Sequence, residues 1–184
     1  MNTDLVEIAT RVTVAYGKGG LRPIDHALCI EKGIDPLDAE FLSTVGLPRE
    51  QQLQISFNLA SELPTLDELL ERTMTQLPKK GRHIVCLNAE YNLVLGIDQD
   101  AGENVVLIDL DEKMDELFVN SRIRFLVGFF AEFVLHWIRW TRQGISEEQS
   151  FQAALQWMQK TDPAALKEGT RWDLAIEQMK QGLL

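Results

Sequence analysis

The first 46 residues carry hydrophobic positions at helical spacing, divided by glycine and proline. One apolar stripe predicts a helix that follows the possible cap Thr3 and stops at Gly17; its members are Leu5, Ile8, Val12 and Ala15. A second helix is predicted over residues 26–32. Asp35-Pro36 then supplies a cap and a residue suited to a first helical turn. The third helix is expected to end at Gly46, because Leu47-Pro48 blocks its continuation.

The pattern becomes extended in the middle of the chain. Leu53, Ile55 and Phe57 alternate with polar residues, which predicts a strand with one buried face. The capping box Thr65–Glu68 predicts an inserted helix. Four further strands are expected, separated by turn residues: 83–87, 91–97, 105–110 and the short 117–119.

Helical spacing returns for the rest of the chain. A long helix is predicted from Asn120-Ser121 to Arg142, a second after the capping box Ser146–Gln149, and a third from about Thr170. Strands joined by short turns imply antiparallel pairing. The order therefore predicts an α+β fold, an antiparallel sheet packed with N- and C-terminal helices, in a single domain over residues 1–184.

Charge narrows the choice of partner. The chain has 184 residues, 45% of them hydrophobic, and a net charge of −10. Such an acidic protein repels nucleic acid and anionic membranes and attracts basic partners. The apolar stretch 125–140 contains Glu132, His136 and Arg139, so it does not resemble a membrane span of about 20 apolar residues. With no basic leader and two isolated cysteines, the sequence predicts a soluble cytoplasmic protein.

The motifs that most often carry chemistry are absent or incomplete. The loop 17–20 matches neither phosphate-binding glycine pattern. Two His-x-x-Cys pairs, His26 with Cys29 and His83 with Cys86, differ in their expected geometry. The first lies on a predicted helix and the second on a predicted strand, where the two side chains point to opposite faces. We therefore predict no catalytic residue, no metal site and no cofactor.

The negative charge is concentrated in one segment. Residues 98–117 contain eight acidic residues and one basic residue, a net charge of −7; the acids are Asp98, Asp100, Glu103, Asp109, Asp111, Glu112, Asp115 and Glu116. Their spacing does not fit a calcium-binding loop. Two interpretations stay open: solvated turns that keep the hairpins from aggregating, and a negative surface that steers a basic protein partner.

All four tryptophans lie in the predicted C-terminal helices, at Trp137, Trp140, Trp157 and Trp172. Packing between helices is the expected role for them. An exposed aromatic residue can also anchor an interface between proteins.

Two motifs, in order, resemble the SUKH superfamily (SMI1/KNR4-like proteins), most of all its SUKH-4 branch. Residues 41–48, FLSTVGLP, resemble the family's first motif, and residues 118–126, FVNSRIRFL, resemble the element in which the last strand passes into a long helix. Trp172 resembles a tryptophan near the end of such domains, so the match covers about residues 36–180. The resemblance implies structural roles for the motif residues Gly46, Leu47, Pro48, Asn120, Ser121, Phe125 and Trp172. Gly46 suits a left-handed helix end, and Asn120 and Ser121 are expected to cap the long helix.

The resemblance also implies a function in binding proteins rather than in catalysis. Bacterial members are mostly immunity proteins that neutralise secreted toxins, many of them nucleases. We therefore expect an immunity protein that binds a basic toxin domain through the acidic segment. The alternative is a regulatory or scaffold adaptor without a toxin partner, and homo-oligomerisation stays open.

Overall fold

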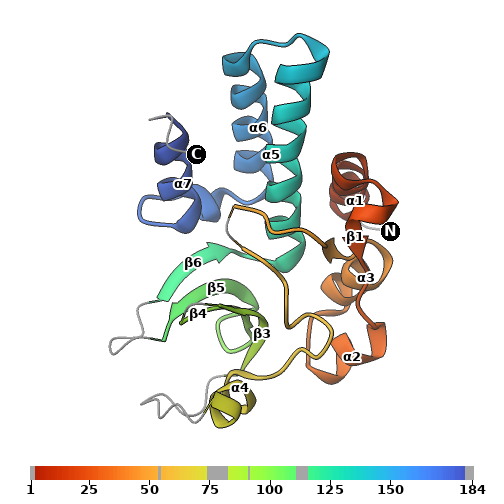
Figure 1. The fold of residues 1–184 in the computed structure, drawn as a ribbon, viewed down its shortest axis with the longest axis vertical. Helices are drawn as coiled ribbons and strands as arrows, with labels where there is room; N and C mark the ends of the chain where they lie inside the picture. Colours follow the sequence, from red (N-terminus) through yellow and green to blue (C-terminus); the bar gives the residue numbers. More distant parts are fainter. Residues whose placement is uncertain (1–2, 54, 74–82, 91, 111–115, 181–184) are drawn as a thin grey trace.

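The computed structural model describes residues 3–53, 55–73, 83–90, 92–110 and 116–180. Within these ranges the fold is α+β, as predicted (Figure 1). The helices are α1 (Thr3–Tyr16), α2 (His26–Glu31), α3 (Pro36–Thr44), α4 (Leu66–Thr73), α5 (Ile123–Gln143), α6 (Glu147–Thr161) and α7 (Arg171–Lys180), with the short 3-10 helices η1 (Lys18–Gly20) and η2 (Pro163–Leu166). The strands are β1 (Leu21–Arg22), β2 (Leu47–Pro48), β3 (Ile84–Glu90), β4 (Leu93–Asp98), β5 (Asn104–Asp109) and β6 (Glu116–Asn120).

Strands β3 to β6 form an antiparallel sheet in sequence order, which confirms the predicted hairpins. One face packs on the main core, which includes Phe129 and Phe130 of α5, and the other face packs on α4. The strands show long buried runs, such as residues 84–88 of β3, because both faces of the sheet are covered.

Helix α4 begins at the predicted capping box. Glu68 N donates to Thr65 Oγ1 at 3.2 Å, and Thr65 N donates to a Glu68 carboxylate oxygen at 2.7 Å. Each residue therefore satisfies a backbone donor of the other. Leu66, Leu69 and Leu70 are buried against the sheet. The predicted continuation to Leu77 lies outside the described residues.

Helices α1 and α3 both contact α5 and lie on the same side of it (Figure 1). The α3 cap is as predicted: Asp35 accepts from Leu37 N and Asp38 N, with Pro36 in the first turn. After α3, Gly46 adopts φ of 91°, and a Cβ there would overlap the carbonyl of Arg22. Only glycine fits this close approach, which lets β1 and β2 pair as a second, two-stranded sheet.

The strand predicted from Leu53 to Asn58 is wrong. Ile55 and Phe57 are buried, but Leu53 has a left-handed φ of 46°. Among the described residues of this segment, the pairing is one isolated bridge between Gln52 and Ile55. The alternation arises because an irregular segment inserts apolar side chains into the core at every second position.

Helices α5 and α6 form a hairpin whose tip projects away from the sheet, with α7 beside its base (Figure 1). Gly144 ends α5 in a left-handed conformation, and Ser146 caps α6 by accepting from Gln149 N at 3.2 Å. Both features agree with the sequence pattern. Leu183, placed by the sequence on the last helix, lies outside the described residues.

Candidate functional site

The motif residues that follow β6 form a buried hydrogen-bond network. Asp162, which precedes η2, accepts from Asn120 Nδ2 at 3.0 Å, from Ser121 N at 2.8 Å and from Ser121 Oγ at 2.7 Å. Asn120 in turn accepts from the Trp172 indole nitrogen at 2.8 Å. Asn120, Asp162 and Trp172 are at most 2% exposed. The network therefore ties β6, η2 and α7 together at the base of α5.

The predicted capping of α5 by Asn120 and Ser121 is wrong, because both side chains belong to this network. The N-cap position is Arg122, whose side chain makes no capping hydrogen bond. Instead Asp38, from α3, accepts from Arg124 N at 3.3 Å. A carboxylate at a helix N-terminus is favourable because backbone N–H groups there lack partners. The cap of α5 thus comes from a residue 86 positions earlier.

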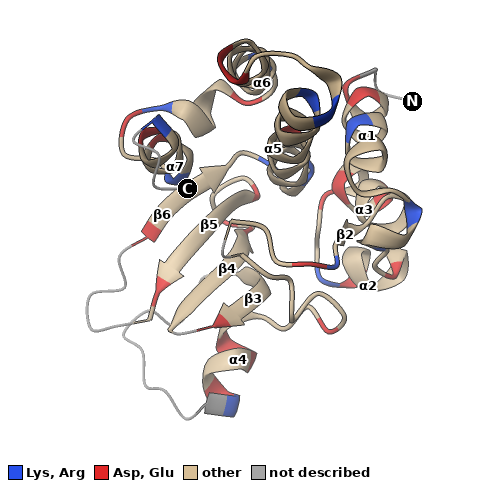
Figure 2. Ribbon diagram, turned by 45° about the horizontal axis from the view of Figure 1, so that its top comes forward, with Lys and Arg blue, Asp and Glu red and all other residues tan. Residues whose placement is uncertain are grey.

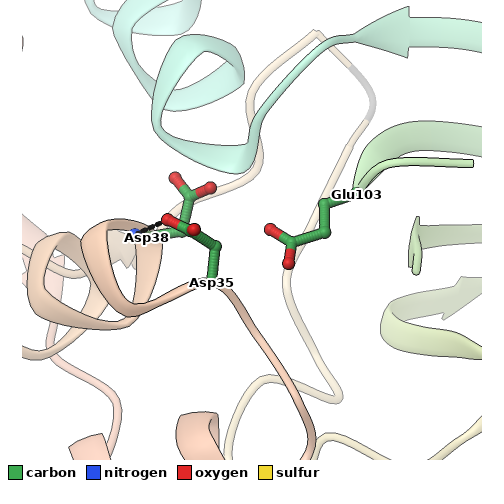
Figure 3. A group of neighbouring side chains, drawn as sticks. All are labelled: Asp35, Asp38 and Glu103. Carbon is green, nitrogen blue, oxygen red and sulfur yellow. Dashed lines mark hydrogen bonds between the residues drawn. The ribbon is translucent and has the colours of Figure 1, made fainter.

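Three carboxylates meet beside this helix start (Figure 3). Asp35, Asp38 and Glu103 offer oxygen atoms that lie within 4.8 Å of one another. Asp35 and Asp38 come from the start of α3. Glu103 comes from the turn between β4 and β5, where its φ of 67° is left-handed, and it points toward the other two.

Two arginines already supply positive charge to this cluster. Arg122 donates to Glu103 at 2.8 Å, and Arg124 Nη1 lies 2.9 Å from Asp38 Oδ1. Burial raises the pKa of Asp38 and of Glu103, and the neighbouring arginine opposes each rise. The oxygen set could hold a small cation in geometric terms. With both arginines in place, its evident action is to hold α3 and the β4–β5 turn against α5.

The acidic segment is divided by the fold. Asp98, Asp100 and Glu103 lie at the turn between β4 and β5, on the side where α5 begins. Asp98 is fully buried and accepts from Asp100 N and Ala101 N, so the prediction that it lies on a surface is wrong. Asp100 accepts from His83 N, and Glu103 binds Arg122. These three carboxylates shape a turn and its contact with α5.

Asp109 and Glu116 lie at the opposite end of the sheet, about 17 Å away along the six residues of β5. Asp109 ends β5 and Glu116 begins β6, while Asp111, Glu112 and Asp115 lie outside the described residues. The register adds Glu90, because Glu90 and Asp109 both pair with Leu93. Acidic residues mark these strand ends and α4 (Figure 2). We call Glu90, Asp109 and Glu116, with the connecting Asp111, Glu112 and Asp115, the acidic end.

Both thiols are buried. Burial raises the pKa of Cys29 to about 11 and that of Cys86 to about 12. At neutral pH each thiol therefore keeps its proton, which disfavours nucleophilic or metal-binding roles. His83 Nδ1 lies 3.4 Å from Asp100 Oδ1 in an exposed contact.

The tryptophans divide into two pairs. Trp157 and Trp172 are buried, at 7% and 2% exposure, and both contact Phe129. Trp137 and Trp140 are 57% and 38% exposed on the projecting part of α5. Packing between helices is therefore confirmed for the first pair and does not account for the second. All four tryptophans lie on helices, so the sequence pattern does not separate the two pairs. Their different exposure arises from the way the helices pack in the fold.

The family model for the SUKH-4 immunity protein matches residues 11–178. The chain belongs to the SUKH-4 immunity protein family. The match confirms the resemblance carried by residues 41–48 and 118–126, and toxin neutralisation through a protein partner follows at the level of the family. The comparisons with curated proteins and with solved structures found no match. Over the described part of this SUKH-4 protein, no helix has the length and apolar character needed to cross a bilayer.

Proposed function

We propose that this SUKH-4 protein neutralises a basic toxin domain in the cytoplasm by binding it through the acidic end of the sheet. The proposal is supported mainly by the position of Glu90, Asp109 and Glu116, which lie at the same end of β3, β5 and β6 in the four-stranded sheet. In sequence, the acidic stretch 111–115 connects β5 to β6. Binding, without catalysis, is the proposed mode of action.

Electrostatics supports this choice of partner. A nuclease toxin needs basic residues to hold phosphates, so its cleft attracts an acidic protein. The chain carries a net charge of −10, and grouping acids at one end of the sheet directs the attraction to a defined surface. We expect the acidic end to speed association and to make it sensitive to salt.

The first experiment tests neutralisation itself. The protein is co-expressed with the toxin encoded by the neighbouring open reading frame, and growth and complex formation are measured. We expect growth to be rescued and a stable complex to be purified. Persistent toxicity without a complex would overturn the proposal and favour the adaptor alternative.

The second experiment tests the surface by charge reversal. The variant carries Asp109→Lys, Asp111→Lys, Asp115→Lys and Glu116→Lys. We expect its association rate with the toxin domain to fall at least about tenfold at low salt, with a weaker dependence on ionic strength.

A matched control separates position from total charge. Glu31, Glu40, Glu50 and Glu168 are exposed and lie outside the acidic end. Reversing these four to Lys raises the net charge by the same amount. Equal slowing by both variants would mean that the acidic end has no special role, provided that both unfold at the wild-type denaturant concentration.

A further inference from the structure

We infer that the projecting half of α5 is a second anchor for the toxin, in which Trp137 and Trp140 enter an apolar hollow of the basic toxin domain. This inference rests on the proposed function and deepens it, because it adds a separate contact surface with different chemistry. The acidic end would attract the partner, and the tryptophans would hold it.

The two indoles form one exposed feature. Their rings lie 5.3 Å apart in an edge-to-face arrangement, and Trp140 also stacks on His136. Ile145, in the loop after α5, is 37% exposed nearby in sequence. Pairing between the rings limits their rotamers, so less conformational entropy is lost when a partner covers them.

The surrounding helix face is apolar. Val134, Trp137, Ile138 and Thr141 follow the spacing i, i+3, i+4, i+7, which places them on one side of α5. Val134 and Ile138 are partly exposed, and none of the four carries a charge. We call this set, with Trp140 and Ile145, the tryptophan face. Charged residues follow it along the chain, with Arg142 in the last turn of α5 and Glu147 and Glu148 in the first turn of α6.

Fold stability does not explain this face. The core aromatic cluster uses Phe129, Phe130 and Phe133 against Trp172, one to two turns closer to the sheet. Trp137 contacts Trp140 and projects beyond that cluster, with more than half of its surface exposed. Tryptophan is also the residue most enriched among interface hot spots.

The small area of the tryptophan face and the negative charge of the chain favour the toxin over a second copy of this chain as the partner. The face extends about 17 Å along the helix and about 10 Å across, roughly 200 Å², whereas a stable dimer buries about 800 Å² per partner. Two copies would each bring a net charge of −10 and would repel. A basic partner is attracted, and by also contacting the acidic protein elsewhere it can supply the missing area.

The test measures binding rates to the toxin domain from the neighbouring open reading frame by surface plasmon resonance. For Trp137→Ala and Trp140→Ala we expect the dissociation rate to rise at least about tenfold, with association changed less than about threefold. The acidic-end reversal should do the opposite, slowing association most. Matched controls are Val14→Ala and Leu174→Ala, at exposed apolar residues of α1 and α7, which should leave both rates unchanged.

The outcomes separate the two proposals. If the wild type binds and both tryptophan variants dissociate at its rate, the second anchor is wrong and the proposed function stands. If the wild type does not bind the toxin, the proposed function is wrong and the anchor falls with it. Sedimentation of the wild type and of Trp137→Ala is the third arm. Self-association that is lost in the variant, with toxin binding intact, would assign the face to a dimer and overturn the inference.

Discussion

The two halves of α5 carry similar side chains in opposite surroundings. In the proximal half every residue from Leu126 to Glu132 is buried, because α1, α6, α7 and the sheet enclose the helix. In the distal half α6 covers one side, and Trp137 and Trp140 face outward. Aromatic residues therefore stabilise the fold in one half and are proposed to bind a partner in the other.

The difference lies in how many elements surround the helix, rather than in its sequence. The proximal half has hydrophobic residues on all sides, and the surrounding helices and the sheet bury them. Apolar residues continue into the distal half, where α6 covers one side, because α5 is 21 residues long and only its first part is enclosed by the core. We expect substitutions to separate the halves: stability changes in one and binding changes in the other.

The largest expected effect comes from Trp172→Ala. The indole is 2% exposed, contacts Phe129, Phe130 and Phe133, and donates to Asn120. Removing it should lower the free energy of unfolding by about 3–5 kcal/mol. Trp137→Ala should change it by less than about 0.5 kcal/mol. Urea unfolding followed by circular dichroism measures both, and equal losses would remove the distinction between the halves.

Glu132 gives the next largest effect. It is fully buried in the proximal half and accepts from Arg11 of α1 and from Arg139, the latter at 3.0 Å. Glu132→Gln removes the buried counter-charge of Arg139 and leaves Arg11 with the Glu7 carboxylate at 3.3 Å, so we expect a loss of about 3 kcal/mol. The control is Glu148→Gln at the exposed tip of the hairpin, with an expected loss below about 1 kcal/mol. If Glu132→Gln lowered the free energy of unfolding as little as Glu148→Gln does, water would be compensating the arginines in place of the carboxylate, and the prediction would be wrong.

Asp162→Asn tests how the proximal half is fixed to the sheet. The change places an amide beside donors from Asn120 and Ser121, and we expect a loss of about 2 kcal/mol. Asp173→Asn is the matched control, since that carboxylate accepts a backbone N–H, from Gly169, in an exposed contact. Thermal unfolding of both variants measures the difference. Unchanged toxin binding by folded Asp162→Asn would confirm that this motif is structural.

Features encoded within a few residues were predictable from sequence. The caps at Asp35, Thr65 and Ser146 depend on hydrogen bonds two or three residues away, and all three formed as expected. Asp162 was missed because its partners lie 41 and 42 residues earlier, and Asp38 because it caps a helix 86 residues later. The spacing of hydrophobic and polar residues along the chain carries no information about contacts between residues so far apart in sequence.

The acidic segment shows the same limit for the candidate site. The negative charge of residues 98–117 was evident from the sequence. Because β5 pairs antiparallel with β4 and with β6, the connections before and after β5 lie at opposite ends of the sheet. The segment was therefore one run in sequence and two sites in space. Glu90 joins the second site through strand register, which a single sequence does not show.

The smallest expected effect is a difference in how the two halves respond to acid. In the distal half, burial lowers the pKa of His136 below its ordinary value of about 6.5. The unfolded chain then binds the proton more readily, so the free energy of unfolding falls as pH drops below about 6.5 and levels off below the folded pKa. Beside the proximal half, the hydrogen bond from Trp157 and the charges of Lys160 and Arg11 lower the pKa of Glu7. Its stabilisation is present above the ordinary value of about 4.3 and is lost as pH falls further.

His136→Gln should therefore flatten the pH dependence of unfolding just below pH 6.5, and Glu7→Gln should flatten it only below about pH 4.3. Urea unfolding in steps from pH 7.5 to 3.5 measures both slopes. Ser150 donates its only hydroxyl proton to the His136 carbonyl, so Nδ1 of the ring must be the donor to Ser150 Oγ at 3.0 Å. Glutamine can keep that donor while removing the titration. If both variants altered the same pH range, the two halves of α5 would share one electrostatic environment despite their different burial.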